Sequence, residues 1–256
     1  MADRYAYVPF IGLFIMLAWG AVEVIQRWKT QKVIVSICTA AVLAACFFAT
    51  WIQVGTWRNS ETVYTHAINV TENNYIAYNN RGVEYDRFGN YNLAIWNFDR
   101  AIEINPKYAE IYNSRGTVYC SLGNYKQAIG DFDRAIEIKP LYAEAYNNRG
   151  IAYVNFGNYK QAIGDYDRAI EIYPKFAEAY NNRGVAYGGF GNYNQAIEDF
   201  NKAIELNPKY VNAYKNRGFA YDKLGHYNKA IEEYKMAARL GHKPAQNYLS
   251  KKGIDW

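Results

Sequence analysis

The sequence has few of the residues that build metal sites and disulfide frameworks, with three cysteines and three histidines in 256 residues. Cys38, Cys46 and Cys120 form no CxxC motif and have no histidine nearby, so we expect neither a metal site nor paired disulfides. His66, His226 and His242 lie far apart and have no nucleophile or carboxylate at catalytic spacing. The sequence therefore predicts a chain that is not an enzyme and that carries no cofactor.

Long runs of like charge are also missing. The formal net charge is +5, but 29 basic residues are dispersed among 24 acidic ones. Nucleic-acid binding would call for basic residues clustered on one face, so we expect no nucleic-acid partner.

Two apolar runs stand near the N-terminus, at about 7–26 and 33–55. Each has about the 20 residues that a helix needs to cross a bilayer, so residues 1–56 are predicted to form a membrane hairpin with the lipid bilayer as a partner. Arg27, Lys29 and Lys32 lie between the runs, which predicts a cytoplasmic turn. The expected location is an integral protein of a bacterial inner membrane, with everything after Trp57 on the periplasmic side.

Two other interpretations of this region remain open. A cleaved signal peptide would carry its basic residues before the first apolar run, whereas here they follow it. The tetrapeptide Leu43-Ala44-Ala45-Cys46 is similar to a bacterial lipoprotein processing site, although the apolar run continues past Cys46.

The 26 tyrosines are abundant and recur at fixed intervals. Aligning them with the glycines gives a period of 34 residues, with copies at 75–108, 109–142, 143–176, 177–210 and 211–244. We number the positions of each copy as places 1 to 34. This pattern resembles the tetratricopeptide repeat, which implies an all-α, right-handed solenoid of helix pairs.

The residues predict the same fold without the resemblance. An aromatic at place 4, a glycine at place 8 and a tyrosine at place 11 share one face of a first helix, helix A. Glycine at place 15 suits a turn, and apolar residues at places 20, 24 and 27 mark a second helix, helix B, which proline at place 32 ends in four copies. Glycine at place 8 predicts close packing of the two helices.

The ends of the array are predicted to differ from its middle. Residues 57–74 match only the second half of a repeat, so we expect a lone helix B there. Residues 245–256 are predicted to contain a capping helix, because a terminal repeat needs a polar outer face.

Asparagines of helix A are the candidate binding residues. In tetratricopeptide proteins helix A lines the concave groove, and in the nucleocytoplasmic N-acetylglucosamine transferase asparagines at place 6 hold an extended peptide by its backbone. The resemblance implies such a peptide-binding groove here, although Ser114 interrupts the row, and amides exposed only to water are the alternative. The candidates at places 5 and 6 are Asn79, Asn80, Asn113, Asn147, Asn148, Asn181, Asn182, Lys215 and Asn216.

Place 7 is an arginine in every copy, and place 23 is an acid in four of the five. One interpretation is a basic stripe for an anionic ligand; the favoured one is an ion pair that ties helix A to helix B. The first copy has Asn97 at place 23, which leaves Arg81 as the arginine most free for another role. The predicted structural pairs are Arg115 with Asp131, Arg149 with Asp165, Arg183 with Asp199, and Arg217 with Glu233.

The whole chain also resembles the C-terminal end of multi-span C-type glycosyltransferases with tetratricopeptide repeats, on residues 3–20 and on WRNSETVYTHAINVTENNYIAYNNRG. That resemblance implies an accessory or truncated part that presents acceptor proteins to a separate multi-span catalytic subunit. The sequence thus leaves two main hypotheses: a membrane-anchored scaffold that binds protein segments in its groove, or a glycosyltransferase accessory.

Overall fold

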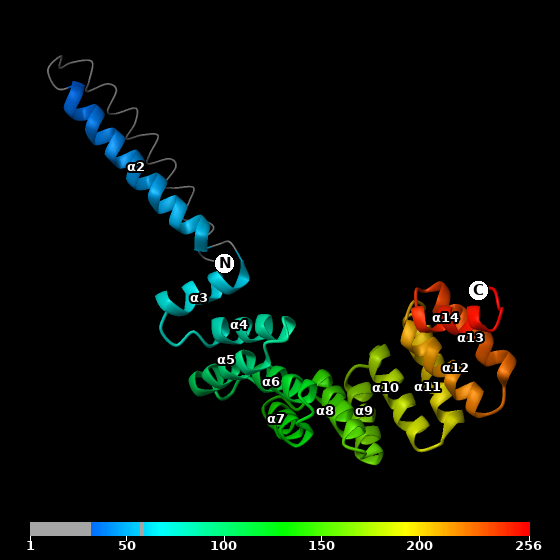
Figure 1. The fold of residues 1–256 in the computed structure, drawn as a ribbon. Helices are drawn as coiled ribbons and strands as arrows, with labels where there is room; N and C mark the ends of the chain where they lie inside the picture. Colours follow the sequence, from blue (N-terminus) through cyan, green and yellow to red (C-terminus); the bar gives the residue numbers. More distant parts are fainter. Residues whose placement is uncertain (1–31, 57–58) are drawn as a thin grey trace. The chain divides into compact units, whose positions relative to one another are not determined.

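The computed structural model describes residues 32–56 and 59–256. All regular structure in these described ranges is helical (Figure 1). The chain divides into two compact units, residues 1–66 and residues 67–256, and each is described by itself.

The described part of the first unit contains α2 (Lys32–Thr56) and most of α3 (Ser60–Val70), which continues into the second unit. Side chains of α2 are described from Cys38 to Trp51, and nearly all of them are exposed, including those of Phe47 and Phe48. The predicted hairpin helix at 7–26 lies outside the described residues.

Within the described residues, no helix has the length and apolar character that a membrane crossing requires. This finding contradicts the prediction of an integral inner-membrane protein with periplasmic repeats, and it removes the support for the bilayer as a partner.

The second unit is a succession of helix pairs with one further helix at its C-terminal end (Figure 1). Each pair consists of a helix A of 13 residues followed by a helix B of 13 or 14 residues. The pairs are α4 (Tyr75–Arg87) with α5 (Tyr91–Ile104), α6 (Ala109–Ser121) with α7 (Tyr125–Ile138), α8 (Ala143–Asn155) with α9 (Tyr159–Ile172), α10 (Ala177–Gly189) with α11 (Tyr193–Leu206), and α12 (Val211–Lys223) with α13 (Tyr227–Arg239).

The turn between the two helices of a pair depends on the glycine at place 15. In the third repeat Gly157 has a φ of +85°, a left-handed conformation that glycine adopts at little cost. The reversal lets the N–H of Asn158 donate to the carbonyl of Tyr153 at 2.7 Å, which closes the C-terminus of α8. The other four repeats have the same glycine with φ between +75° and +80°.

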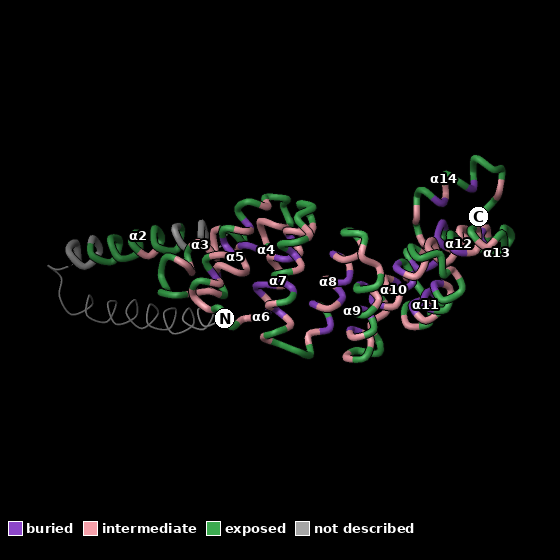
Figure 2. Tube along the Cα trace, turned by 90° about the horizontal axis from the view of Figure 1, so that it is seen from below, coloured by how far each residue is buried: buried purple, intermediate pink, exposed green. Residues whose placement is uncertain are grey.

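Helices A and B of one repeat approach each other at the glycine of place 8. A Cβ built on Gly150 would lie 2.6 Å from the ring of Tyr166, a side chain that is 1% exposed. The same contact recurs with the aromatic at place 24 in every repeat. Rows of buried alanine at places 20 and 27 complete the contact surface of helix B, and Figure 2 shows the buried positions recurring along the array.

The C-terminal helix α14 (Lys243–Lys251) closes the array. Its N-terminus is capped by His242, whose Nδ1 accepts the N–H of Ala245 at 3.2 Å, and Pro244 occupies the first turn. Leu249 is fully buried in a cluster with Tyr214 and Ala238, so α14 covers the apolar surface of the last repeat.

Candidate functional site

Consecutive A helices of the second unit contact one another directly, in addition to their contacts with the B helices. The side chains at places 2, 6, 9 and 13 of helix A follow one helical stripe, because their spacings are four, three and four. We call this surface the groove face. Its apolar members at place 9 include Val83, Val185 and Phe219, all of which are exposed.

The arginines of place 7 lie between the helices and are held by several groups. In the third repeat Arg149 donates to both carboxylate oxygens of Asp165, from Nε at 2.9 Å and from a terminal nitrogen at 2.6 Å. Its other terminal nitrogen donates at 2.5 Å to Asp133, which belongs to helix B of the preceding repeat. The guanidinium also lies over the ring of Tyr146, 5.5 Å from its centroid.

The same arrangement occurs in the second and fourth repeats. Arg115 pairs with Asp131 and reaches Asp99, and Arg183 pairs with Asp199 and reaches Asp167. One arginine therefore links three helices: its own helix A, its own helix B and the preceding helix B.

The first and last arginines have different partners. Arg217 donates to both oxygens of Glu233 and to Asn201, while its buried Nε has no hydrogen-bond partner among the residues that the structure describes. Arg81 donates from Nε to the side chain of Asn97 at 2.9 Å. Arg81 therefore also has a partner across its helix pair, because the amide of Asn97 takes the place of the missing acid, and another role for Arg81 stays a prediction.

Burial and ion pairing act in opposite directions on these groups. Burial lowers the pKa of Arg149, but its hydrogen bonds to Asp165 and Asp133 outweigh burial and raise the pKa above its ordinary value. Burial raises the pKa of Asp165, and Arg149 opposes that rise. Because these guanidinium donors face carboxylates of their own and of the preceding repeat, they do not form a basic stripe on the groove face.

The asparagines of places 5 and 6 form a chain of hydrogen bonds between repeats. The side-chain N–H of the place 6 asparagine donates to the side-chain Oδ1 of the place 5 asparagine in the preceding repeat. These bonds join Asn148 to Asn113 at 3.0 Å, Asn182 to Asn147 at 3.0 Å, and Asn216 to Asn181 at 2.9 Å.

The asparagines at place 5 and those at place 6 differ in how far they are buried. Asn147 and Asn181 at place 5 are 2% and 4% exposed, so they cannot present their amides to a peptide, contrary to the expectation for the groove. Asn148 and Asn182 at place 6 are half-buried on the groove face. An amide group has two N–H donors and two acceptor lone pairs, so each place 6 asparagine keeps one donor and at least one lone pair beyond these bonds.

The row is broken once, between the first two repeats. Asn79 lies at place 5, but the next repeat has Ser114 at place 6, whose side chain is shorter and has no amide N–H. Within the described part of the chain, the Oδ1 of Asn79 is buried and has no hydrogen-bond partner, although its amide nitrogen donates to Asn80 at 3.3 Å. At the other end Lys215 replaces the asparagine of place 5, and its charge acts on His242 beside α14.

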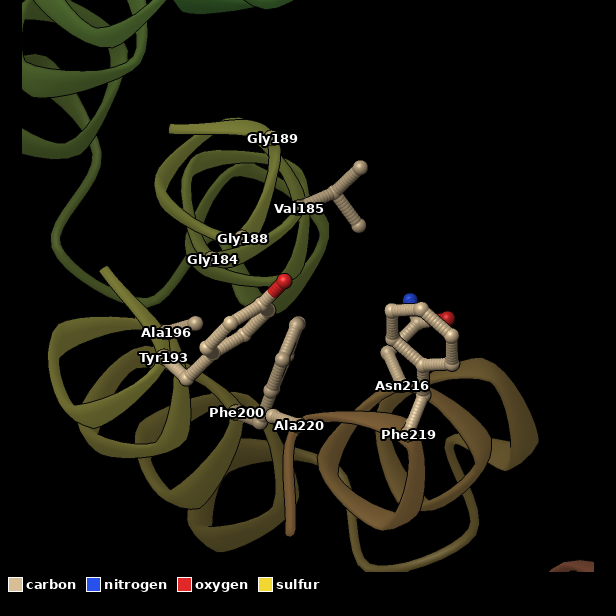
Figure 3. A pocket seen from close by; sticks show the side chains of 10 residues that line it. All are labelled: Gly184, Val185, Gly188, Gly189, Tyr193, Ala196, Phe200, Asn216, Phe219 and Ala220. Atoms are coloured by element: carbon tan, nitrogen blue, oxygen red, sulfur yellow. The ribbon is translucent and has the colours of Figure 1, made fainter. Parts of the chain in front are cut away.

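A cavity of about 400 Å³ opens beside the row in the fourth and fifth repeats. Figure 3 shows Val185 of α10 and Phe219 of α12 on either side of an open space, with Tyr193 and Phe200 of α11 also lining it. Asn216 contributes the amide at its border. Sequence reasoning missed this cavity, although the pair Gly188-Gly189, which no other repeat has at places 12 and 13, was a visible signal.

Comparison with protein families agrees with the helix pairs. Profiles described as "Tetratricopeptide repeat" match residues 107–175, 177–210 and 200–232, and one described as "TPR repeat" matches residues 83–120. None of these four profiles describes a glycosyltransferase, so the resemblance to a glycosyltransferase C-terminus is not shown.

Solved structures give the same result. The crystal structure of MamA protein is 27% identical with a TM-score of 0.56, over 67% of this chain and 94% of that one. YrrB, described as "a TPR protein with an unusual peptide-binding site", is 24% identical with a TM-score of 0.55, over 73% and 97%. A thermophilic TPR protein in Thermus thermophilus is 20% identical with a TM-score of 0.60, over 69% and 97%.

No curated protein matches the chain. The family profiles together reach from residue 83 to residue 232, and the chain covers almost the whole length of each solved structure named above. On the period, the helix pairs and these matches, the chain belongs to the tetratricopeptide-repeat proteins.

Proposed function

We propose that this chain is a scaffold for protein–protein interaction that binds an extended peptide segment along the groove face. The observation that carries the proposal is the row of place 6 amides, Asn148, Asn182 and Asn216, on successive A helices. Each amide is fixed by its bond to the preceding repeat and keeps a donor and a lone pair. Backbone N–H and C=O groups of a peptide need such partners when they leave water.

Fixed amides favour binding because a rigid side chain loses little conformational entropy when a ligand arrives. The bond from Asn182 to Asn147 holds the amide of Asn182 in one orientation before any peptide is present. Recognition of the backbone is independent of the peptide's side chains, so this row supplies affinity more than selectivity.

The apolar side chains at place 9 flank the amides and supply a second kind of contact. Val185 and Phe219 are exposed on the same stripe as Asn182 and Asn216, three residues further along each helix. Side chains of an extended peptide point alternately to opposite sides, so one set would contact these groups while the backbone meets the amides.

Site-specific crosslinking tests this proposal. A photoreactive residue at Val185 lies on the groove face without breaking the bond between Asn182 and Asn147. The matched control is Lys160, which is exposed on α9, a B helix. The proposal predicts capture of protein segments from Val185 and little from Lys160, and competition by an unstructured peptide pool. Equal labelling from both positions would mean that the asparagine row is ordinary repeat surface.

The role of a glycosyltransferase accessory rests on the sequence resemblance alone. It requires a multi-span catalytic partner, and the profiles and structures named above describe none. If crosslinking from Val185 captures a multi-span catalytic protein, the accessory role is supported as a special case of the scaffold.

A further inference from the structure

The cavity beside α10 lies where two other repeats hold an apolar side chain. In the third repeat Val154 at place 12 packs against a cluster that contains Ala162 and Tyr166. In the second repeat Cys120 occupies the same place and packs against the cluster around Phe132. The fourth repeat has Gly188 at place 12, and its cluster around Phe200 receives no side chain from that place.

Packing does not require glycine at this position. A Cβ built on Gly188 meets no atom of the described residues within 4 Å, whereas one built on the neighbouring Gly189 would lie 2.5 Å from the ring of Tyr159. Gly188 is the last residue but one of α10 and does not have a positive φ, so the backbone does not require glycine there either. The missing side chain at Gly188 therefore leaves space in the fourth repeat without a compensating contact.

The lining of the cavity selects for an uncharged occupant. It consists of glycine, alanine, valine, aromatic and asparagine residues, and none of the ten carries a charge. A charged side chain placed there would lose its hydration without gaining an ion pair, which is unfavourable. At roughly 30 Å³ per water molecule, about 400 Å³ corresponds to about a dozen waters, enough space for one large apolar side chain.

The cavity is continuous with the row of amides through Asn216, which lines it. The amide of Asn216 donates to Asn181 at 2.9 Å, so it is fixed at the border of the cavity. A peptide whose backbone is bound at Asn216 would carry its next inward side chain past Phe219 and Val185.

We propose that this cavity binds one side chain of leucine, methionine or phenylalanine size from the peptide held on the groove face. The incoming side chain takes the place that Val154 fills in the third repeat. This inference rests on the proposed function and adds selectivity to it: the amides bind any extended backbone, and the cavity requires a large apolar residue at one position.

The test uses the full chain and a phage library of random octapeptides, followed by affinity measurements on fluorescein-labelled copies of the selected peptides. The inference predicts that one position is enriched in leucine, methionine or phenylalanine, and that alanine there weakens binding about tenfold or more. Gly188→Val restores the side chain of the third repeat and should remove that difference. Gly164→Val is the matched control, because Gly164 is helical, exposed and has nothing within 4 Å of a built Cβ.

The outcomes separate this inference from the proposed function. If selected peptides lose affinity with Asn182→Ala but show no apolar position, or bind Gly188→Val as well as the original chain, the cavity proposal is wrong and the groove stands. If no peptide is selected, both proposals fail. If Gly188→Val instead abolishes self-association of the chain in light scattering, the occupant is a second copy and the peptide assignment is overturned.

Discussion

At the scale of single residues, Ser114 leaves the buried side-chain Oδ1 of Asn79 without a donor in the described ranges 32–56 and 59–256. We predict that Ser114→Asn stabilises the protein by about 1 kcal/mol, because it adds the hydrogen bond that Asn148 makes to Asn113 in the next repeat. Urea unfolding of the two proteins measures the difference. Ser114→Ala is the control and should change little. If Ser114→Asn instead destabilises the protein, the spacing between α4 and α6 does not allow the hydrogen bond between the two asparagines.

His242 gives a second prediction at this scale, a pH dependence of α14. Burial, with help from Lys215, lowers the pKa of His242 from its ordinary value of 6.5. His242 therefore binds a proton more readily when α14 is uncapped than when it is capped. The stabilisation by the cap is fully present above pH 6.5, and it is lost as the pH falls through the lowered pKa of the capped state. Protonated Nδ1 cannot accept the N–H of Ala245.

Hydrogen exchange of the α14 amides at pH 7.5 and 5.5 measures this effect, and we expect weaker protection at pH 5.5 after correction for intrinsic exchange. His242→Asn provides a cap that does not titrate, so its protection should be independent of pH. The same pH dependence in both proteins would assign it to another group.

Contacts within one repeat could be predicted from the sequence, whereas contacts between repeats could not. The spacing of 16 residues pairs Arg149 with Asp165, and these side chains are in contact. The third contact, to Asp133, depends on how repeats stack, which spacing within one repeat does not contain. The burial of Asn147 was missed for the same reason, because it involves the next A helix, whose Asn182 donates to Asn147.

At the scale of helices, the fit of helix A against helix B depends on glycine at place 8. We predict that Gly150→Ala destabilises the protein by about 1–3 kcal/mol, because the added Cβ would meet the buried ring of Tyr166. Gly164→Ala, on the exposed side of α9, should stabilise it by up to about 1 kcal/mol. Thermal unfolding compares them, and the same sign for both variants would contradict the packing account.

The ion pair between α8 and α9 gives another prediction at this scale. Arg149→Met leaves the carboxylate of Asp165 buried without its partner, so we expect a loss of about 3 kcal/mol. Asp165→Asn should cost less, because Arg81 already bonds to Asn97 in the first repeat. The double variant should lose less than the sum of the single losses.

Chemical denaturation of the four proteins completes this double-mutant cycle. Breaking the exposed pair of Arg168 and Glu171 is the control and should have no measurable effect. Additive losses at Arg149 and Asp165 would mean that the two side chains do not act as a pair.

Repeats and turns could be predicted at the helix scale because each glycine, aromatic and alanine recurs five times. The N-terminal segments have no such repetition, and the interpretation there used only apolar length. That criterion predicted a membrane crossing at 33–55, which the described residues do not support.

At the scale of the whole molecule, the second unit repeats one set of contacts, and each repeat depends on its neighbours. The asparagine row and the arginine that reaches the preceding helix B both join one repeat to the next. These bonds position the place 6 amides before any ligand arrives. The central claim is therefore that the groove face binds a peptide by its backbone.

Backbone N-methylation tests this claim most directly. In an extended peptide alternate N–H groups point to the same side, so only one alternate set can face the asparagines. For a peptide selected by the full chain, methylating that set should weaken binding about tenfold or more, and methylating the other set should change it little. If both sets tolerate methylation, or both abolish binding equally, the asparagine row does not hold the peptide backbone.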